Sequence, residues 1–243
     1  MSNSHAYVIT VNGLERWYGR GSAVVHALVG IDLNVRQGEM VALMGPSGSG
    51  KSTLMQILGL LDRPDAGSYQ FAGEDVHRLS SREAANLRGT RIAFVFQAIH
   101  LLPRLNVLNN VELPMRYAHF AAAERRSRAL DSLERVGLAG LVDRKPPQLS
   151  GGQAQRVAIA RAVAPGPDVL LADEPTGALD RASGREVLSL FQELNRRLGL
   201  TMVIVTHDPF VAQHAQRIVE LEDGRIVADR PVEHRLHAKG VGA

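Results

Sequence analysis

The stretch MVALMGPSGSGKSTLMQIL, from Met40 to Leu58, decides the fold of this chain. Its first five residues are apolar and run into a glycine, a pattern that favours a buried strand over a helix. Beyond the glycine-rich turn, apolar residues recur at the spacing of one helical stripe, at Leu54, Ile57, Leu58 and Leu61. A strand, a glycine-rich turn and a helix in this order predict the β-loop-α unit of an α/β domain.

The turn has the spacing G-x-x-x-x-G-K-[ST] of a phosphate-binding loop. Glycines allow backbone N–H groups to converge on phosphate oxygens, and the following helix adds the positive end of its dipole. Lys51 would reach the β- and γ-phosphates of a nucleotide, and Ser52 would offer its hydroxyl to Mg²⁺. A glycine-rich turn without a ligand is the structural alternative. The predicted nucleotide-binding residues of this loop are Gly45, Pro46, Ser47, Gly48, Ser49, Gly50, Lys51, Ser52 and Thr53.

A second strand supplies the carboxylates that such a site needs. The run VLLADE carries Asp173 and Glu174 to its end, and ligands of parallel sheets collect at the carboxyl ends of strands. Asp173 would hold Mg²⁺, and Glu174 would orient or deprotonate the water that attacks the γ-phosphate. The alternative, a polar strand exit before Pro175, is weakened by the phosphate loop upstream.

Further apolar runs predict the rest of an α/β core. Residues 92–97 and 201–208 are typical of buried parallel strands, and residues 185–199 supply a crossover helix. The segment before Met40 alternates and turns at residues 37–39 like antiparallel β-structure. The run RIVELEDGRIVAD predicts a hairpin that turns at Asp223 and Gly224.

A helical region follows residue 97. Leu130, Leu133 and Val136 share one face of a helix that ends at Gly137, and the two prolines of RKPPQLS predict a non-helical linker. We therefore predict one domain over 7–227, with a helical subdomain at about 98–160 inserted into a three-layer nucleotide-binding core. Residues 228–243 are expected to form a C-terminal tail, loose at least over its last residues.

The bulk composition narrows the class of protein. The chain has 243 residues, 45% of them hydrophobic, and no cysteine, which excludes disulfides and thiolate metal sites. No apolar run approaches the ~18 residues that span a bilayer, and the N-terminus lacks the pattern of a secretory signal. The net charge of +3 demands no nucleic-acid partner. These features predict a cytoplasmic location and, at most, peripheral attachment to a membrane.

Three single residues and one short motif carry weaker signals. Tyr18 could stack on a purine, Gln97 could coordinate Mg²⁺ or sense the γ-phosphate, and His207 could contact the γ-phosphate. Taken singly, each is more often a structural residue at a strand or strand end. The motif LSGGQ, from Leu149 to Gln153, opens a helix whose positive end is a second anion site.

The order of these motifs resembles that of ATP-binding-cassette (ABC) ATPases. From about Tyr7 to Val227, the chain presents Tyr18, GPSGSGKST, Gln97, LSGGQ, VLLADE, ALD and His207 in the family's order. LSGGQ is the most specific of them, since other phosphate-loop proteins lack it. The resemblance implies an α/β fold with a three-layer P-loop NTPase (RecA-like) core, an antiparallel β N-terminal subdomain and an inserted α-helical subdomain.

The resemblance also implies a role for each residue. Lys51, Glu174 and His207 correspond to catalytic residues, while Ser52, Gln97 and Asp173 correspond to Mg²⁺ ligands. Tyr18 resembles the aromatic residue that stacks on adenine, and Asp180 lies in the family's D-loop. In a head-to-tail dimer, Ser150, Gly151, Gly152 and Gln153 would close on the ATP that a second copy holds.

Finer details point to one group within the family. VFQAIHLLPRLNVLNNVELPM and LLADEPTGALD resemble ATPases of the macrolide-export, lipoprotein-release and cell-division type, although LSGGQAQR replaces that group's frequent LSGGEQQR. The group implies ATP hydrolysis with Mg²⁺, an integral membrane permease-type partner docked on the segment 99–115, and a peripheral position at the inner membrane.

Three other functions stay open at this point. One is a regulatory ATPase that gates a cell-envelope partner without transporting a substrate. Another is an ABC ATPase that acts on nucleic acid or ribosomes, which is disfavoured because the chain has no room for coiled-coil arms or a second cassette. A small-molecule kinase would leave LSGGQ unexplained.

Overall fold

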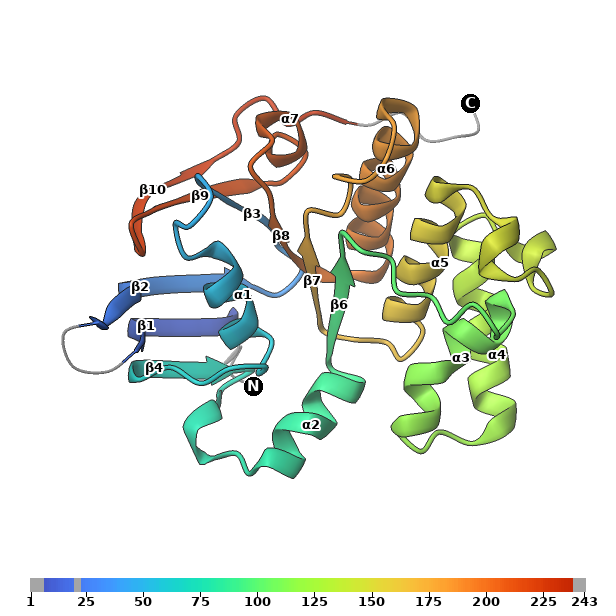
Figure 1. Cartoon of the computed structure of the whole chain (residues 1–243), viewed down its shortest axis with the longest axis horizontal. Helices are drawn as coiled ribbons and strands as arrows, with labels where there is room; N and C mark the ends of the chain where they lie inside the picture. The colour runs from blue at the N-terminus through green and yellow to red at the C-terminus, as the bar shows by residue number, and fades with distance from the viewer. Residues whose placement is uncertain (1–6, 20–22, 238–243) are drawn as a thin grey trace, which may run out of the picture.

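The helix α1 (Lys51–Leu58) of the predicted β-loop-α unit packs between two β-sheets, and the strand of the unit belongs to the larger of them (Figure 1). The computed structural model describes residues 7–19 and 23–237. Within them, the larger sheet has the strand order β10-β9-β3-β8-β7-β6. Its strands are β3 (Met40–Met44), β6 (Ile92–Phe96), β7 (Val169–Asp173), β8 (Thr201–Val205), β9 (Arg217–Glu222) and β10 (Arg225–Pro231). All neighbours are parallel except the predicted β9–β10 hairpin, so β3, β6, β7 and β8 end at one edge.

The smaller sheet is antiparallel and has the order β2-β1-β4-β5. Its strands are β1 (Tyr7–Tyr18), β2 (Val25–Arg36), β4 (Ala66–Phe71) and β5 (Glu74–Asp75). Ile9 and Val11 of β1 are fully buried while Thr10 between them is not, which is the alternation of a sheet with one apolar face. The turn predicted at residues 37–39 joins β2 to β3.

Two apolar cores lie on the two faces of the larger sheet. Val41 and Leu43 of β3 face a core shared with α1 and the smaller sheet. Met40 and Ala42 of the same strand face a second core, which contains residues of α3, α4, α5 and α6. Because strand side chains alternate between faces, one continuous apolar run serves both cores. The predicted three-layer α/β architecture is confirmed.

Seven α-helices lie in the described residues, and the sequence individually predicted the four that contain Leu54, Leu133, Gly152 and Val187. The seven helices are α1 (Lys51–Leu58), α2 (Ser81–Thr90), α3 (Val107–Tyr117), α4 (Ala122–Arg135), α5 (Gly151–Val163), α6 (Arg181–Leu198) and α7 (Pro209–Ala212). Short 3₁₀ turns occupy Val76–Arg78, Ala139–Leu141 and Pro146–Gln148. The group α3 to α5 connects β6 to β7 and lies on the side of the larger sheet away from β1, β2 and β4 (Figure 1).

Three local predictions were wrong: the burial of Leu61, the burial of Leu130 and the absence of a helical turn at Pro146 and Pro147. Leu61 is 52% exposed because α1 ends at Leu58, and Leu60 adopts a positive φ of 58° that turns the chain away. Leu130 is also exposed, although Leu133 and Val136 are buried as predicted. Pro146 and Pro147 do form a helical turn, because the first positions of a 3₁₀ helix need no N–H donor.

The C-terminal segment is more ordered than expected. Strand β10 continues to Pro231, and the N–H groups of Val232 and Leu236 donate to the carbonyls of Gln216 and Gln213 at 2.9 Å each. The expected tail is therefore held as far as Leu236, and 238–243 lie outside the described residues. Among the described residues, no helix combines the length and apolar character required to cross a bilayer.

Candidate nucleotide-binding and catalytic site

The loop between β3 and α1 adopts a conformation that only glycine accommodates at two positions. Gly45 has a φ of 151°, and a Cβ there would overlap the carbonyl oxygen of Leu221. Gly50 has a φ of 100°, and its Cβ would lie 2.5 Å from the carbonyl oxygen of Ala27. The loop is therefore pressed against β9 and β2 at its two ends, and this packing fixes the start of α1 (Lys51–Leu58).

Lys51 is held over this loop by backbone carbonyls. Its Nζ donates to the carbonyl oxygens of Gly45 at 2.8 Å and Pro46 at 2.6 Å, and lies 3.4 Å from Ser49 Oγ. Burial lowers the pKa of Lys51, while the carboxylates of Glu174 and Asp173 act in the opposite direction. A lysine with oxygen acceptors on one side and two carboxylates nearby is placed to exchange these carbonyls for phosphate oxygens.

Asp173 occupies the end of β7, in register with Phe96 of β6 and Val205 of β8. Burial raises the pKa of its carboxyl, the charge of Glu174 adds to that effect, and Lys51 opposes it. The described residues contain no group of three or more His, Asp or Glu side chains that could hold a metal alone. Mg²⁺ commonly uses one or two protein ligands together with phosphate oxygens, so Asp173 and the exposed hydroxyl of Ser52 fit that need.

Glu174 is the centre of a hydrogen-bonded group. It has a positive φ of 42°, and its N–H donates to the carbonyl of Val205 at 2.9 Å. Its Oε1 accepts from the backbone N–H of His207 at 2.9 Å and lies 2.6 Å from His207 Nδ1. Its Oε2 accepts from the hydroxyl of Thr206 at 3.1 Å. The structure thus brings together Glu174 and His207, the two residues to which the resemblance assigns the base and a γ-phosphate contact, and adds Thr206.

Gln97 lies next to the loop that follows Glu174, whereas Tyr18 lies at the end of β1 and contacts Asp62 and Arg16. Gln97 follows β6, and its amide lies against the loop after Glu174, where a Cβ on Gly177 would be 2.9 Å from Gln97 Nε2. Tyr18 ends β1 and is 40% exposed. Its hydroxyl donates to Asp62 Oδ2 at 3.0 Å, and the Arg16 guanidinium lies 4.5 Å from the ring centroid. Arg16 therefore covers one face of the Tyr18 ring.

The LSGGQ motif forms the start of α5 (Gly151–Val163). Ser150 caps this helix: its Oγ accepts from the N–H of Gln153 at 3.2 Å, and its own N–H donates to Gln153 Oε1 at 3.0 Å. Helix α5 contributes to one apolar core and α1 to the other, on opposite faces of the larger sheet. Within one chain, the structure therefore does not bring this motif together with the phosphate loop.

Asp180 performs a structural task at the start of α6 (Arg181–Leu198). Its carboxylate accepts from the N–H groups of Ala182 and Ser183 at 2.9 and 3.0 Å and from Ser183 Oγ at 2.7 Å. The hydrogen bond from the Ser183 backbone is the main reason that the pKa of Asp180 is lowered. Gly152 packs on the same serine, since a Cβ there would lie 2.9 Å from Ser183 Oγ.

Sequence reasoning missed three residues that shape the site. Thr206 supports Glu174, Gln155 Nε2 donates to the carbonyl of Pro175 at 2.9 Å, and the N–H of Gly224 donates to the carbonyl of Ser49 at 3.1 Å. Thr206 directly precedes His207 and so carried a signal in the sequence. The other two contacts join segments that are at least 20 residues apart, and only the tertiary structure reveals them.

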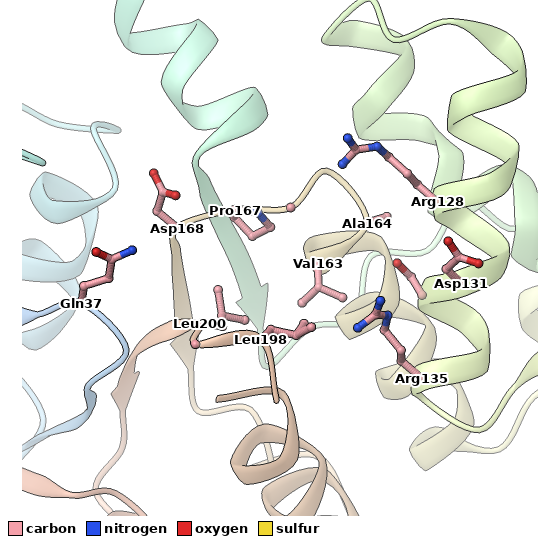
Figure 2. Close-up of a pocket in the computed structure, with 13 residues that line it drawn as sticks. Gln37, Arg128, Asp131, Arg135, Val163, Ala164, Pro167, Asp168, Leu198 and Leu200 are labelled. Carbon is pink, nitrogen blue, oxygen red and sulfur yellow. The ribbon is translucent and has the colours of Figure 1, made fainter. Parts of the chain in front are cut away.

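A cavity of about 470 Å³ lies at the other edge of the larger sheet (Figure 2). Gln37, Asp168 and Leu200, which line it, precede β3, β7 and β8, while Arg128 and Arg135 enter from α4. The phosphate loop and the carboxylates lie at the carboxyl ends of the strands. This cavity is therefore separate from the candidate nucleotide site and contains none of its residues.

The fold and the site define a P-loop ATPase: a phosphate loop, a strand-end carboxylate pair and a helical insertion on one parallel sheet. A family model described as ABC transporter matches residues 28–177, and the chain belongs to this family. It is an ATP-binding and ATP-hydrolysing cassette. The resemblance drawn from the motif order is thereby confirmed.

Relatives refine this assignment. The chain is 55% identical over 222 residues to the macrolide export ATP-binding/permease protein MacB of Sodalis glossinidius (strain morsitans), covering 91% of this chain and 34% of that protein. MacB 1/2 of Paracoccus denitrificans (strain Pd 1222) is 54% identical over 230 residues, with 95% and 34% covered. The chain thus spans about a third of the length of these curated relatives.

Solved structures give the same result. A dimeric structure of a post-hydrolysis state of the ATP-binding cassette MJ0796, bound to ADP and Pi, aligns with a TM-score of 0.83 and 41% identity. The alignment covers 93% of this chain and 99% of that one. The structure of cbiO1 from Clostridium perfringens aligns with a TM-score of 0.86, 31% identity and coverage of 94% and 90%.

Proposed function

We propose that this chain is the ATPase subunit of a membrane-associated ABC system and works as a head-to-tail, nucleotide-sandwich dimer. The dimer is supported by one observation: the two predicted anion sites of a single chain are separated from each other. The loop at Lys51 and the helix start at Ser150 belong to opposite faces of the larger sheet. Two such sites act on the same phosphates when the second site comes from another copy, and the similar cassette MJ0796 is described as dimeric.

In this dimer, the phosphate loop of each copy binds ATP and Lys51 binds the β- and γ-phosphates. Ser52, Gln97 and Asp173 would hold Mg²⁺, which would supply positive charge to the β- and γ-phosphates. Glu174 accepts the proton of the attacking water, and His207 contacts the γ-phosphate. Ser150, Gly151, Gly152 and Gln153 of the second copy close the site with the positive end of α5. Tyr18 stacks on adenine, and Asp180 places the D-loop at the dimer interface.

The proposed partner is an integral membrane permease-type protein, with this chain on the cytoplasmic side of the inner membrane. The similar MacB proteins are named ATP-binding/permease proteins. The second half of the expected docking segment 99–115 contributes to the core, because Val107, Val111 and Met115 are buried, whereas Leu102 in its first half is exposed. Its exposed neighbour Tyr117 lines a groove of about 710 Å³ between α2 and the end of α3, with Leu79 and His119. We place the docking surface on this groove and propose export, lipoprotein release or periplasmic mechanical work as the task.

The experiment combines two substitutions. Glu174→Gln keeps the shape of the side chain but removes the base, so ATP binding is retained, turnover falls by roughly 10²–10⁴-fold, and an ATP-bound dimer accumulates in size-exclusion chromatography. Adding Ser150→Arg places a bulky cation at the helix start, which abolishes that dimer while the monomer still binds ATP. Normal steady-state hydrolysis by Glu174→Gln would refute Glu174 as the base. Loss of ATP binding in the monomeric double variant would mean that both anion sites act within one chain.

A further inference from the structure

Thr206 lies where the ends of three strands meet at the catalytic carboxylate. It follows directly on β8, and its N–H donates to the carbonyl of Leu43 on β3 at 3.1 Å. Leu43 lies two residues before Gly45, where the phosphate loop begins. The side-chain Oγ1 of Thr206 contacts Glu174, which follows β7, at 3.1 Å. Thr206 thus connects the strand that leads into the phosphate loop to the proposed general base.

The direction of this hydrogen bond is determined by its neighbours. The backbone N–H of Asp208 donates to Thr206 Oγ1 at 3.1 Å, which uses one acceptor position of the hydroxyl. An ionised carboxylate can only accept. The Thr206 hydroxyl therefore donates its proton to Glu174 Oε2, and the residue is fully buried with a relative exposure of 0%. Threonine is stiff at χ1, so this donor is fixed in place.

The second carboxylate oxygen is held differently. Glu174 Oε1 accepts from the backbone N–H of His207 and lies 2.6 Å from Nδ1 of the His207 ring, whose side chain is 74% exposed. The terminal torsion of a glutamate side chain is broad and weakly restricted. Of the two side chains that contact the Glu174 carboxylate, Thr206 is buried in the fold and His207 is exposed, so Thr206 is the contact that the surrounding structure holds in place.

We propose that Thr206 is the positioning residue for Glu174 in ATP hydrolysis: its buried hydroxyl orients the carboxylate relative to the phosphate loop. The inference rests on the proposed role of Glu174 as the base. A general base works only within hydrogen-bond reach of the proton that it removes, and small misplacements are costly. Thr206 itself does not touch the reacting atoms, so it acts on the rate of the chemical step and leaves ATP binding unchanged.

The test compares Thr206→Val, which keeps the shape and loses the hydroxyl, with Thr206→Ser, which keeps the hydroxyl. We expect kcat of Thr206→Val to fall roughly 10- to 100-fold, the effect of losing a hydrogen bond to a charged group, with KM for ATP unchanged. Thr206→Ser restores kcat to within about threefold of the wild type. The matched control is Thr201→Val, at the other end of β8, where a fully buried hydroxyl accepts from the N–H of Gly38 at 3.0 Å. It loses a similar buried hydrogen bond and keeps its kcat.

A double-variant cycle separates positioning from general destabilisation. Because Thr206 acts through Glu174, Thr206→Val added to Glu174→Gln causes no further loss in single-turnover hydrolysis. The inference is overturned if Thr206→Val and Thr201→Val have the same kcat, if Thr206→Ser is as slow as Thr206→Val, or if the two losses multiply in the double variant. Thr206→Ser keeps the experiment decisive if Thr206→Val fails to fold. Wild-type turnover by Glu174→Gln alone would instead contradict the proposed function.

Discussion

Gly50→Ala tests whether the close approach of the phosphate loop to β2 is a structural requirement. At Gly50, φ is 100°, and an added Cβ would lie 2.5 Å from the carbonyl oxygen of Ala27 and 2.9 Å from Leu28 Cδ2. A left-handed conformation costs a non-glycine residue about 1–2 kcal/mol, and overpacking adds about 1–3 kcal/mol. We therefore expect the free energy of unfolding to fall by roughly 2–5 kcal/mol in total.

Gly30→Ala is the matched control for this prediction. Gly30 also has a positive φ, 63°, but no atom lies within 4 Å of the position that its Cβ would occupy, so the added methyl group meets open space. The stability loss at Gly30 should stay at the ~1–2 kcal/mol of conformational strain alone. Urea unfolding without nucleotide measures both variants, and steady-state hydrolysis should fall by about 10²-fold only in Gly50→Ala, whose loop must shift. Equal stability losses with wild-type hydrolysis in both variants would refute the packing argument.

Two further substitutions test the carboxyl group of Asp173 and the proposed docking groove at Tyr117. Burial raises the pKa of Asp173 in the folded chain, so its ionised form opposes folding at neutral pH, and this penalty disappears below its ordinary value of 3.8. Asp173→Asn should therefore abolish hydrolysis but raise the free energy of unfolding at neutral pH. The difference in unfolding free energy between the variant and the wild type should disappear in acid. A variant that is less stable than the wild type in urea unfolding at neutral pH would contradict this. Tyr117→Asp, at a side chain that is 77% exposed, should weaken co-purification with a membrane partner and leave ATPase activity intact. The control is Leu198→Asp, at an exposed apolar side chain that lines the cavity of Figure 2 and not this groove. Equal recovery of the partner by both variants would exclude the groove beside α2.

The start of α5 at Ser150 is connected to the loop that carries Glu174 by contacts of Asp180, Gly152 and Gln155. Asp180 caps α6, Gly152 packs on Ser183 of that helix, and Gln155 binds the carbonyl next to Glu174, at Pro175. In the proposed dimer, the start of α5 contacts the ATP of one site while Gln155 contacts the loop that carries Glu174 of the other. The contacts of Gln155 and Gly152 therefore link the helix start that serves one ATP to the loop that carries the base of the other.

The sequence by itself determined the chemistry of this protein. The loop from Gly45 to Thr53, the pair Asp173 and Glu174, and the motif at Ser150 are local patterns, because phosphate binding needs particular residues at short, fixed spacings. Continuous apolar runs likewise predicted the parallel strands that are buried on both faces.

Only the tertiary structure decided how these parts cooperate. It places α1 and α5 on opposite faces of one sheet, brings Thr206 to Glu174 across 32 residues of sequence, and presses Gly50 against Ala27. It also exposes Leu61, which helical spacing had assigned to the core. Periodicity describes one element at a time, whereas the end of a helix and the partner of a hydroxyl depend on which segments pack together across the whole fold.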